Sequence, residues 1–272
     1  MSDPVIRIGH SPDPDDAFMF YGFASGQVEI PGHAIEHVML DIQSLNEMGL
    51  GDDPLEVTAL SLHAFLELED RYEFLEVGTS VGRNYGPRLI ANEARSLESL
   101  AGCRVALPGP KTTATLVIRQ VLPDFEEVHM DFTKIMDAVR AGDVDAGLII
   151  HEGQLTYKDE GFTLLADMGE VFAQRHGGLP LPLGVNCVRS DIDPAVKTQI
   201  ADAYRKSVNI ALTQRKAALD YALSFARGLD PKLADTFVGM YVNEDSLAFN
   251  DEIKEAVEIL REEYWNHASA NR

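Results

Sequence analysis

The chain has few cysteines, no long apolar run and no basic leader. Among its 272 residues only Cys103 and Cys187 are cysteines, and neither stands in a spacing typical of a zinc site or a disulfide framework. No apolar stretch approaches the length of a transmembrane helix, and the start lacks the regions of a secretory signal. These absences predict a cytoplasmic globular protein, although a secreted protein whose signal has been removed would look the same.

Positive charge is also scarce. The sequence has 23 Lys and Arg against 44 Asp and Glu, which gives a formal net charge of −21. Such a charge argues against nucleic acid and against anionic membrane surfaces as partners. The hydrophobic and charged fractions, 45% and 25%, are ordinary for a globular protein. We interpret the acidic excess as a surface that keeps the protein in solution.

Several chemical signatures are missing as well. The sequence has no Gly-x-x-x-x-Gly-Lys phosphate loop and no Gly-x-Ser-x-Gly nucleophile elbow. No two histidines form a metal-binding pair four residues apart on one helix. Asp13, Asp15 and Asp16 could suggest a divalent metal, but helix capping and the helix dipole account for the first two. We therefore expect no metal site.

What the sequence does contain is an alternation of strand and helix patterns, which favours an α/β fold. The expected strands are 5–8, 35–40, 57–62, 74–77, 89–91, 104–107, 128–132, 147–150, 164–167 and 181–188. Expected helices include 42–48, 113–122, 134–141, 170–176, 196–212, 216–227, 232–241 and 251–267. Asp13 and Asp41 are predicted to cap the helices that follow them.

The order of these elements predicts two lobes. Residues 1–94 and 189–272 are expected to form a discontinuous α/β lobe, and residues 95–188 an inserted α/β lobe. Because the chain crosses twice between the lobes, we expect an interdomain cleft. This is the plan of the two-lobed type II periplasmic-binding-protein fold.

The most informative segment is the apolar run that ends in His151 and Glu152. Gly147 to Ile150 is predicted to be a buried strand, and the histidine follows it directly. In open α/β sheets the carboxyl ends of strands face the ligand crevice, and histidine titrates near neutral pH. His151 is therefore a candidate general base; the alternative is a histidine that only hydrogen-bonds at the end of a strand.

A second candidate site lies in Pro108-Gly-Pro-Lys-Thr-Thr-Ala114, which joins a strand to a helix. Thr112 and Thr113 place hydroxyl and backbone N–H groups at the helix N-terminus, where anions bind readily. Ordinary threonine capping is the alternative, and it is compatible with anion binding.

Two more segments follow strands of the first lobe. Ser11 and Asp16 lie in Ser11-Pro-Asp-Pro-Asp-Asp16 and could contact substrate hydroxyl groups. Ser61 ends another strand and is a candidate hydrogen-bond donor; capping of the following helix is the equally good alternative.

Together these motifs resemble the 1,4-dihydroxy-6-naphthoate synthase family of the futalosine pathway of menaquinone biosynthesis. The likeness runs nearly end to end. Its segments are Ser11-Pro-x-Pro-x-Asp16-x-Phe18, Gly109-x-x-Thr112-Thr113-Ala114, Gly147-Leu-Ile-Ile-His151-Glu152, Thr156-Tyr157 and Gly178-Leu-Pro-Leu-Pro-Leu-Gly184. Asp13, Asp15 and Ala17 stand where the family usually has Cys, Asn and Thr in its first motif.

The resemblance implies a two-lobed lyase that converts cyclic dehypoxanthinyl futalosine, a small carboxylate, to 1,4-dihydroxy-6-naphthoate by base-initiated elimination and without a cofactor. It also implies that His151 is the proton acceptor. The family's substrate-binding segments fall on Ala59, Leu60 and Ser61 and on Thr112, Thr113 and Ala114.

Two other functions stay open at this point. A solute-binding protein for a small carboxylate could use the same cleft without chemistry. The related chorismate dehydratase shares the fold and the pathway, but the segment His151-Glu-Gly-x-x-Thr-Tyr157 weighs against it.

Overall fold

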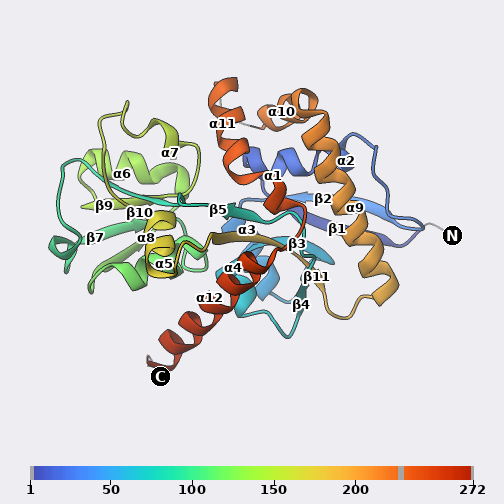
Figure 1. The fold of residues 1–272 in the computed structure, drawn as a ribbon, viewed down its shortest axis with the longest axis horizontal. Coiled ribbons are helices and arrows are strands. Elements are labelled where there is room, and N and C mark those ends of the chain that lie inside the picture. Colours follow the sequence, from blue (N-terminus) through green and yellow to red (C-terminus); the bar gives the residue numbers. More distant parts are fainter. Residues whose placement is uncertain (1–2, 226–229, 271–272) are drawn as a thin grey trace. The chain divides into compact units, whose positions relative to one another are not determined.

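The chain folds into two compact units, each built on its own β-sheet (Figure 1). The computed structural model describes residues 3–225 and 230–270, with side chains described as far as residue 266. The first unit comprises residues 1–81 and 182–254, and the second comprises residues 82–181 and 255–272.

The first unit contains a six-stranded mixed sheet in the order β2-β1-β3-β11-β4, with β5 also paired to β11. Its strands are β1 (Val5–His10), β2 (Ala34–Met39), β3 (Val57–Ser61), β4 (Tyr72–Phe74), β5 (Ser80–Gly82) and β11 (Leu181–Arg189). β1 runs parallel to β2 and β3, whereas β11 runs antiparallel to β3 and β4. The carboxyl ends of β1 and β3 therefore lie at the same edge of the sheet.

Helices pack on this first sheet in two groups. α3 (Ile42–Leu50) and α4 (Leu62–Leu66) contact β3, where Leu45, Leu55 and Ala59 form a small apolar cluster. A larger core joins β1 to the other helices of this unit. These are α1 (Pro14–Met19), α2 (Tyr21–Ala24), α9 (Pro194–Thr213), α10 (Arg215–Leu223) and α11 (Pro231–Tyr241).

The second unit contains a five-stranded sheet in the order β10-β6-β9-β7-β8. Its strands are β6 (Arg88–Ala91), β7 (Arg104–Leu107), β8 (Glu126–His129), β9 (Ala146–Ile149) and β10 (Thr163–Asp167). β7 is parallel to β8 and β9, whereas β6 is antiparallel to β9 and β10. Its helices are α5 (Thr113–Val121), α6 (Ile135–Ala141), the short α7 (Gly153–Thr156) and α8 (Met168–Arg175). α12 (Asp251–Ala270) begins among the residues of the first unit and continues among those of the second.

Strand pairing differs from the lobe limits expected from the sequence at both crossings. Residues 88–91 were expected in the first lobe, but β6 hydrogen-bonds to β9 and β10 of the second sheet. Residues 181–188 were expected in the inserted lobe, but β11 pairs with β3 and β4 of the first sheet. An apolar pattern reveals a buried strand without revealing the sheet that it joins.

Three predicted elements end several residues before their expected limits. The strand expected at 74–77 ends at Phe74, because Glu76 adopts a left-handed backbone with φ of 52°. The strand expected at 128–132 ends at His129, and Asp131 caps a 3₁₀ turn instead. The helix expected at 216–227 ends at Leu223, and the last two residues of that prediction lie outside the described part of the chain.

The predicted capping residues behave differently from each other. Asp41 accepts hydrogen bonds from the backbone N–H groups of Gln43 and Ser44, so its prediction as a helix cap is confirmed. Asp13 occupies the N-cap position of α1, but its side chain makes no capping hydrogen bond.

Among the described residues, none of the helices combines the length and the apolar character that a membrane span requires.

Candidate active site

The candidate residues of the second unit follow the carboxyl ends of two neighbouring strands of its sheet. β7 and β9 are parallel neighbours, with Ala106 opposite Gly147. Thr112 follows the carboxyl end of β7, and His151 follows the carboxyl end of β9. The structure therefore places the threonine helix start and the histidine beyond the same ends of adjacent strands, where open α/β sheets bind ligands.

A backbone hydrogen bond determines the tautomer of the neutral His151 ring. The backbone N–H of Gly153 donates to Nδ1 over 3.0 Å. A ring nitrogen that accepts carries the lone pair, so the neutral ring bears its proton on Nε2. Nε2 is buried and makes no hydrogen bond of normal geometry to any described residue.

The surroundings of His151 favour its neutral form while leaving it able to take a proton. Burial lowers the pKa of His151 below its usual value, because the charged ring loses water. The carboxylate of Glu152, with Oε2 3.8 Å from Nδ1, acts in the opposite direction and raises the pKa, as does the nearby Phe132 backbone. The ring is thus neutral at neutral pH and has a carboxylate beside it that stabilises the imidazolium.

Gly153 allows the short helix α7 to begin directly against this ring. A Cβ atom at this position would lie 2.7 Å from both His151 Cε1 and Met136 Sδ, closer than real Cβ contacts. Phe132 packs beside the imidazole with ring centroids 5.5 Å apart. The absence of a side chain at Gly153 is therefore what permits the hydrogen bond to Nδ1.

The threonine segment is built first as a helix cap. Thr112 is the N-cap of α5, and its Oγ1 accepts from the backbone N–H of Thr115 over 3.3 Å. The same hydroxyl lies 3.1 Å from the Gly109 carbonyl, to which it donates. Thr113 and Ala114 form the first turn and are buried. Capping thus holds for Thr112, whereas the anion-binding role of Thr113 and of the helix start stays a prediction.

In the first unit Ser11 and Ser61 follow the parallel strands β1 and β3. Ser11 accepts a hydrogen bond from Asp13 N–H at its Oγ, and its own N–H donates to Asp16 Oδ2 over 3.2 Å. Ser61 does not cap α4; its Oγ accepts from Asn46 Nδ2 and its N–H donates to Asn46 Oδ1. Asn46 is a site neighbour that sequence reasoning missed.

Asp16 is a buried titratable group at this edge, and its pKa is raised. Burial raises the pKa of its carboxyl well above the usual value, and the nearby carboxylates of Asp15 and Asp13 raise it further. The Ser11 N–H opposes this shift. Asp16 can therefore carry a proton at a pH where ordinary aspartates are ionised, which suits a hydrogen-bond donor to a substrate oxygen.

Ala59 and Leu60 lie inside β3, opposite Asn186 and Val185 of β11. Leu60 is fully buried and Ala59 is nearly so. Their side chains belong to the packing of the first unit, and only the end of the segment, at Ser61, carries a polar side chain.

A second histidine, His10, also ends a strand but was not predicted as a site residue. It is buried in the first unit and stacks on Phe20 with ring centroids 3.9 Å apart. Its Nδ1 lies 3.1 Å from the Ser11 carbonyl, so Nδ1 carries the proton and donates. Burial lowers the pKa of His10 to about 4.

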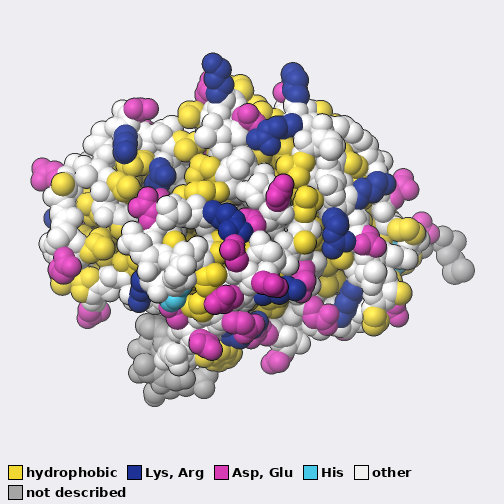
Figure 2. Space-filling view, in the orientation of Figure 1, with side chains coloured by type: hydrophobic (Ala, Val, Ile, Leu, Met, Phe, Trp, Pro, Cys, Tyr) yellow, Lys and Arg dark blue, Asp and Glu magenta, His cyan; other side chains and the backbone are white. Residues whose placement is uncertain are grey.

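The described part of the chain holds no metal cluster, and both signs of charge occur on the face that Figure 2 shows. Among the side chains of residues 3–225 and 230–266, no three or more from His, Cys, Asp or Glu are grouped so that they could hold a metal ion. On the face shown in Figure 2, acidic and basic side chains are interspersed.

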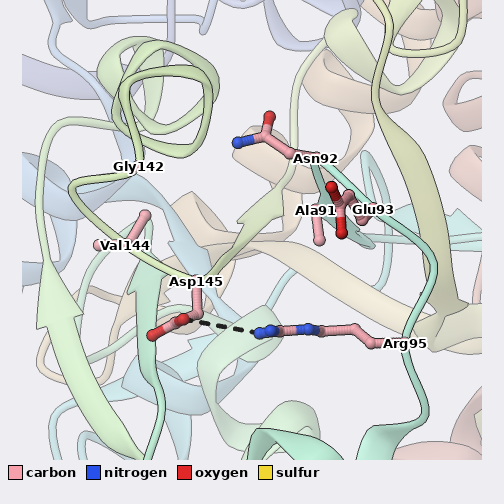
Figure 3. A pocket seen from close by; sticks show the side chains of 7 residues that line it. All are labelled: Ala91, Asn92, Glu93, Arg95, Gly142, Val144 and Asp145. Atoms are coloured by element: carbon pink, nitrogen blue, oxygen red, sulfur yellow. Dashed lines mark ion pairs between the residues drawn. The ribbon is translucent and has the colours of Figure 1, made fainter.

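A pocket of about 270 Å³ opens at the opposite end of the second sheet (Figure 3). Ile90 of β6 pairs with Gly147 of β9, so the end of β6 lies beside the start of β9 and away from His151. Arg95 and Asp145 form an ion pair of 3.6 Å across the pocket. The lining residues are Ala91, Asn92, Glu93, Arg95, Gly142, Val144 and Asp145. None of the predicted site residues is among them.

Comparison of the fold first defines a class. The periplasmic aliphatic sulphonate-binding protein of Escherichia coli superposes with a TM-score of 0.69, covering 98% of this chain and 88% of that chain at 14% identity. This similarity establishes a two-lobed fold of the periplasmic-binding-protein type.

Sequence similarity then identifies the family. Residues 6–265 match the family described as Menaquinone biosynthesis, and the chain belongs to it. A 1,4-dihydroxy-6-naphthoate synthase of Thermus thermophilus is 37% identical over 256 residues, 94% of this chain and 92% of that protein. A solved protein of Archaeoglobus fulgidus is 40% identical with a TM-score of 0.92, covering 97% of this chain and 98% of that chain.

Proposed function

We propose that this protein converts cyclic dehypoxanthinyl futalosine to 1,4-dihydroxy-6-naphthoate, in the cytoplasm and without a cofactor. The observation that carries the proposal is His151, a buried neutral histidine beside a carboxylate at the carboxyl end of β9. The naming of the Thermus thermophilus relative and the family match support the same reaction.

His151 is the proton acceptor in this proposal. A carbon next to a carbonyl group loses its proton to the imidazole. The electron pair left on that carbon forms a C=C bond, while the bond from the next carbon to its leaving group breaks and that group departs with the bonding electrons; loss of a further ring proton then gives the aromatic product. The lone pair of the neutral ring is on Nδ1, so Nδ1 takes the proton. The hydrogen bond from the Gly153 N–H to this atom therefore breaks as the proton arrives. The carboxylate of Glu152 then stabilises the imidazolium that forms.

The start of α5 supplies the site for the substrate carboxylate. Its backbone N–H groups and the Thr113 hydroxyl offer donors at the positive end of the helix dipole. Thr112 caps this helix start, and Ala114 is a buried residue of its first turn.

The candidate residues of the first unit bind the rest of the substrate. Ser11, Asp16 and Ser61 provide polar groups, and Ala59 and Leu60 form the strand that holds Ser61 in place. With its raised pKa, Asp16 donates a hydrogen bond in its protonated form.

Incubation with cyclic dehypoxanthinyl futalosine, followed by mass spectrometry of the products, tests the proposal. We expect 1,4-dihydroxy-6-naphthoate to form at an undiminished rate in the presence of a chelator. The solute-binding fold favours one rival function, binding without chemistry. Recovery of bound but unchanged substrate would establish that rival and reject the proposed reaction.

A further inference from the structure

Arg88 lies beside the end of β9, the strand that leads directly into His151. It begins β6 and pairs with Ile149, the last residue of β9. On its other side it is opposite Asp167, the last residue of β10. Its side chain is therefore placed at the same edge of the second sheet as His151, between two strands that both run antiparallel to β6.

The Arg88 guanidinium makes three contacts in three directions. Nε donates to Asp167 Oδ2 over 3.0 Å, and Nη1 donates to the backbone carbonyl of Gln154. The guanidinium carbon also lies 5.5 Å from the centre of the Tyr157 ring. Gln154 and Tyr157 belong to α7 and its C-terminal cap, so two of the three contacts hold this one short helix.

Asp167 is a rigid anchor for that guanidinium. Its side chain is only 1% exposed, and its Oδ1 accepts from Gly169 N–H over 3.0 Å as the N-cap of α8. Burial raises the pKa of Asp167, and the Arg88 charge opposes this shift. The guanidinium thus favours the charged form of the carboxylate, and the ion pair fixes Arg88 against the start of α8.

The helix that Arg88 holds is the one that orients the catalytic candidate. Gly153, at the start of α7, donates its N–H to His151 Nδ1. Gln154 follows it directly, and its own N–H bonds back to the His151 carbonyl over 2.9 Å. A shift of the Gln154 carbonyl would therefore move the group that selects the protonated nitrogen of the ring.

We infer that Arg88 is a positioning residue for His151, which it orients through α7 rather than by contact, keeping the ring proton on Nε2 and the lone pair on Nδ1 beside Glu152. This role rests on the proposed function of His151 as the proton acceptor. Arginine suits it because its planar fork bonds in several directions at once, which the single ammonium of lysine does not reproduce.

The test compares Arg88→Lys with Arg119→Lys. Arg119 lies in the same unit, donates twice to the Glu127 carboxylate and has a side chain 23% exposed against 21% for Arg88. Lysine at position 88 keeps the pair with Asp167 but releases α7. Nitrogen-15 NMR of the imidazole in the ligand-free protein reports its tautomer and its pKa without any substrate.

In the wild type and in Arg119→Lys we expect His151 in the Nε2–H form with a pKa below 6.5. In Arg88→Lys we expect a mixture of tautomers and a pKa that moves up toward 6.5, because the released ring regains water. With the proposed substrate, kcat should fall about 10- to 100-fold, as for a slightly misplaced catalytic group, while KM stays nearly constant.

An unchanged tautomer and pKa in Arg88→Lys would overturn the inference. If Arg88→Lys does not fold, hydrogen exchange of the wild-type Gly153 amide decides: protection comparable to the β9 amides supports the inference, and exchange at the rate of an exposed amide overturns it. A wild type that does not convert the substrate, combined with the expected NMR change, would reject the proposed reaction and leave the positioning role intact.

Discussion

His10 and His151 occupy matching places in the two units, yet the surroundings give them different chemistry. Each lies at the carboxyl end of a parallel strand, and burial lowers the pKa of each. His10 donates from Nδ1 to the Ser11 carbonyl and stacks on Phe20. His151 accepts at Nδ1 and has Glu152 beside it. The two rings therefore hold opposite tautomers.

A histidine at the end of a strand needs a counter-charge in order to act as a base. No carboxylate contributes to the pKa shift of His10; the coulombic contribution comes from His37 and lowers the pKa further. Protonated His10 would be a buried charge without a counter-charge, whereas protonated His151 has Glu152. A position at the end of a strand is thus not enough for a histidine to act as a base. A neighbouring carboxylate lowers the free-energy cost of protonating the buried ring.

The largest loss of activity is expected for His151→Asn, which removes the basic nitrogen and keeps a polar side chain of similar reach. Loss of a general base costs about 10²- to 10⁴-fold in rate, so we expect kcat to fall by that factor while the substrate still binds. Steady-state kinetics and calorimetric binding measure the two effects. His33→Asn is the control, because His33 bonds to the Pro31 carbonyl in the loop before β2. Full turnover by His151→Asn would exclude the ring from the reaction.

His10 should affect stability in acid rather than catalysis. Its pKa is about 4 in the folded protein and about 6.5 when unfolded, so the unfolded chain binds the extra proton between these values. Stability from this group is therefore complete above pH 6.5 and is lost as the pH falls toward 4, by about 3 kcal/mol.

His10→Phe preserves the stack on Phe20 and removes the titration. Urea unfolding at pH 7 and pH 4 should show that the wild type loses about 3 kcal/mol more than the variant on acidification. Asp16, whose pKa is raised, makes stability fall as the pH rises from about 4, and it does so equally in both proteins. An identical acid loss in the two proteins would mean that His10 is accessible to water.

The sequence predicted the ends of the strands better than it predicted the side chains that orient the residues at those ends. The strand 104–107 was predicted with its observed limits, and the strand before His151 was displaced by one residue. Sequence reasoning did not identify Arg88, because its partners Gln154 and Asp167 are 66 and 79 residues away in the chain. Local patterns encode periodicity and caps, whereas contacts at such separations depend on the pairing of β6 with β9 and β10.

Thr113→Val tests substrate recognition at the edge that carries His151. A hydrogen bond to a charged group contributes about 1.5–3 kcal/mol, so loss of the hydroxyl should weaken binding of the carboxylate substrate about tenfold or more. Isothermal titration with the substrate and with an analogue that lacks the carboxylate separates the effects. The analogue should bind both proteins equally; equal weakening of substrate and analogue would mean that Thr113 does not recognise the carboxylate.

The smallest effect is expected for Thr112→Val. This variant tests whether the Thr112 hydroxyl caps α5 or binds the substrate carboxylate. Thr112 Oγ1 accepts from Thr115 N–H and donates to the Gly109 carbonyl, so its hydrogen bonds are used within the segment. Loss of an N-cap hydroxyl costs about 1 kcal/mol of unfolding free energy, and valine keeps the shape. We expect that loss in urea unfolding, with substrate affinity changed less than in Thr113→Val. If Thr112→Val instead left stability intact and weakened carboxylate binding tenfold, its hydroxyl would belong to the ligand site, and the division of labour between the two threonines would be the reverse of the one proposed.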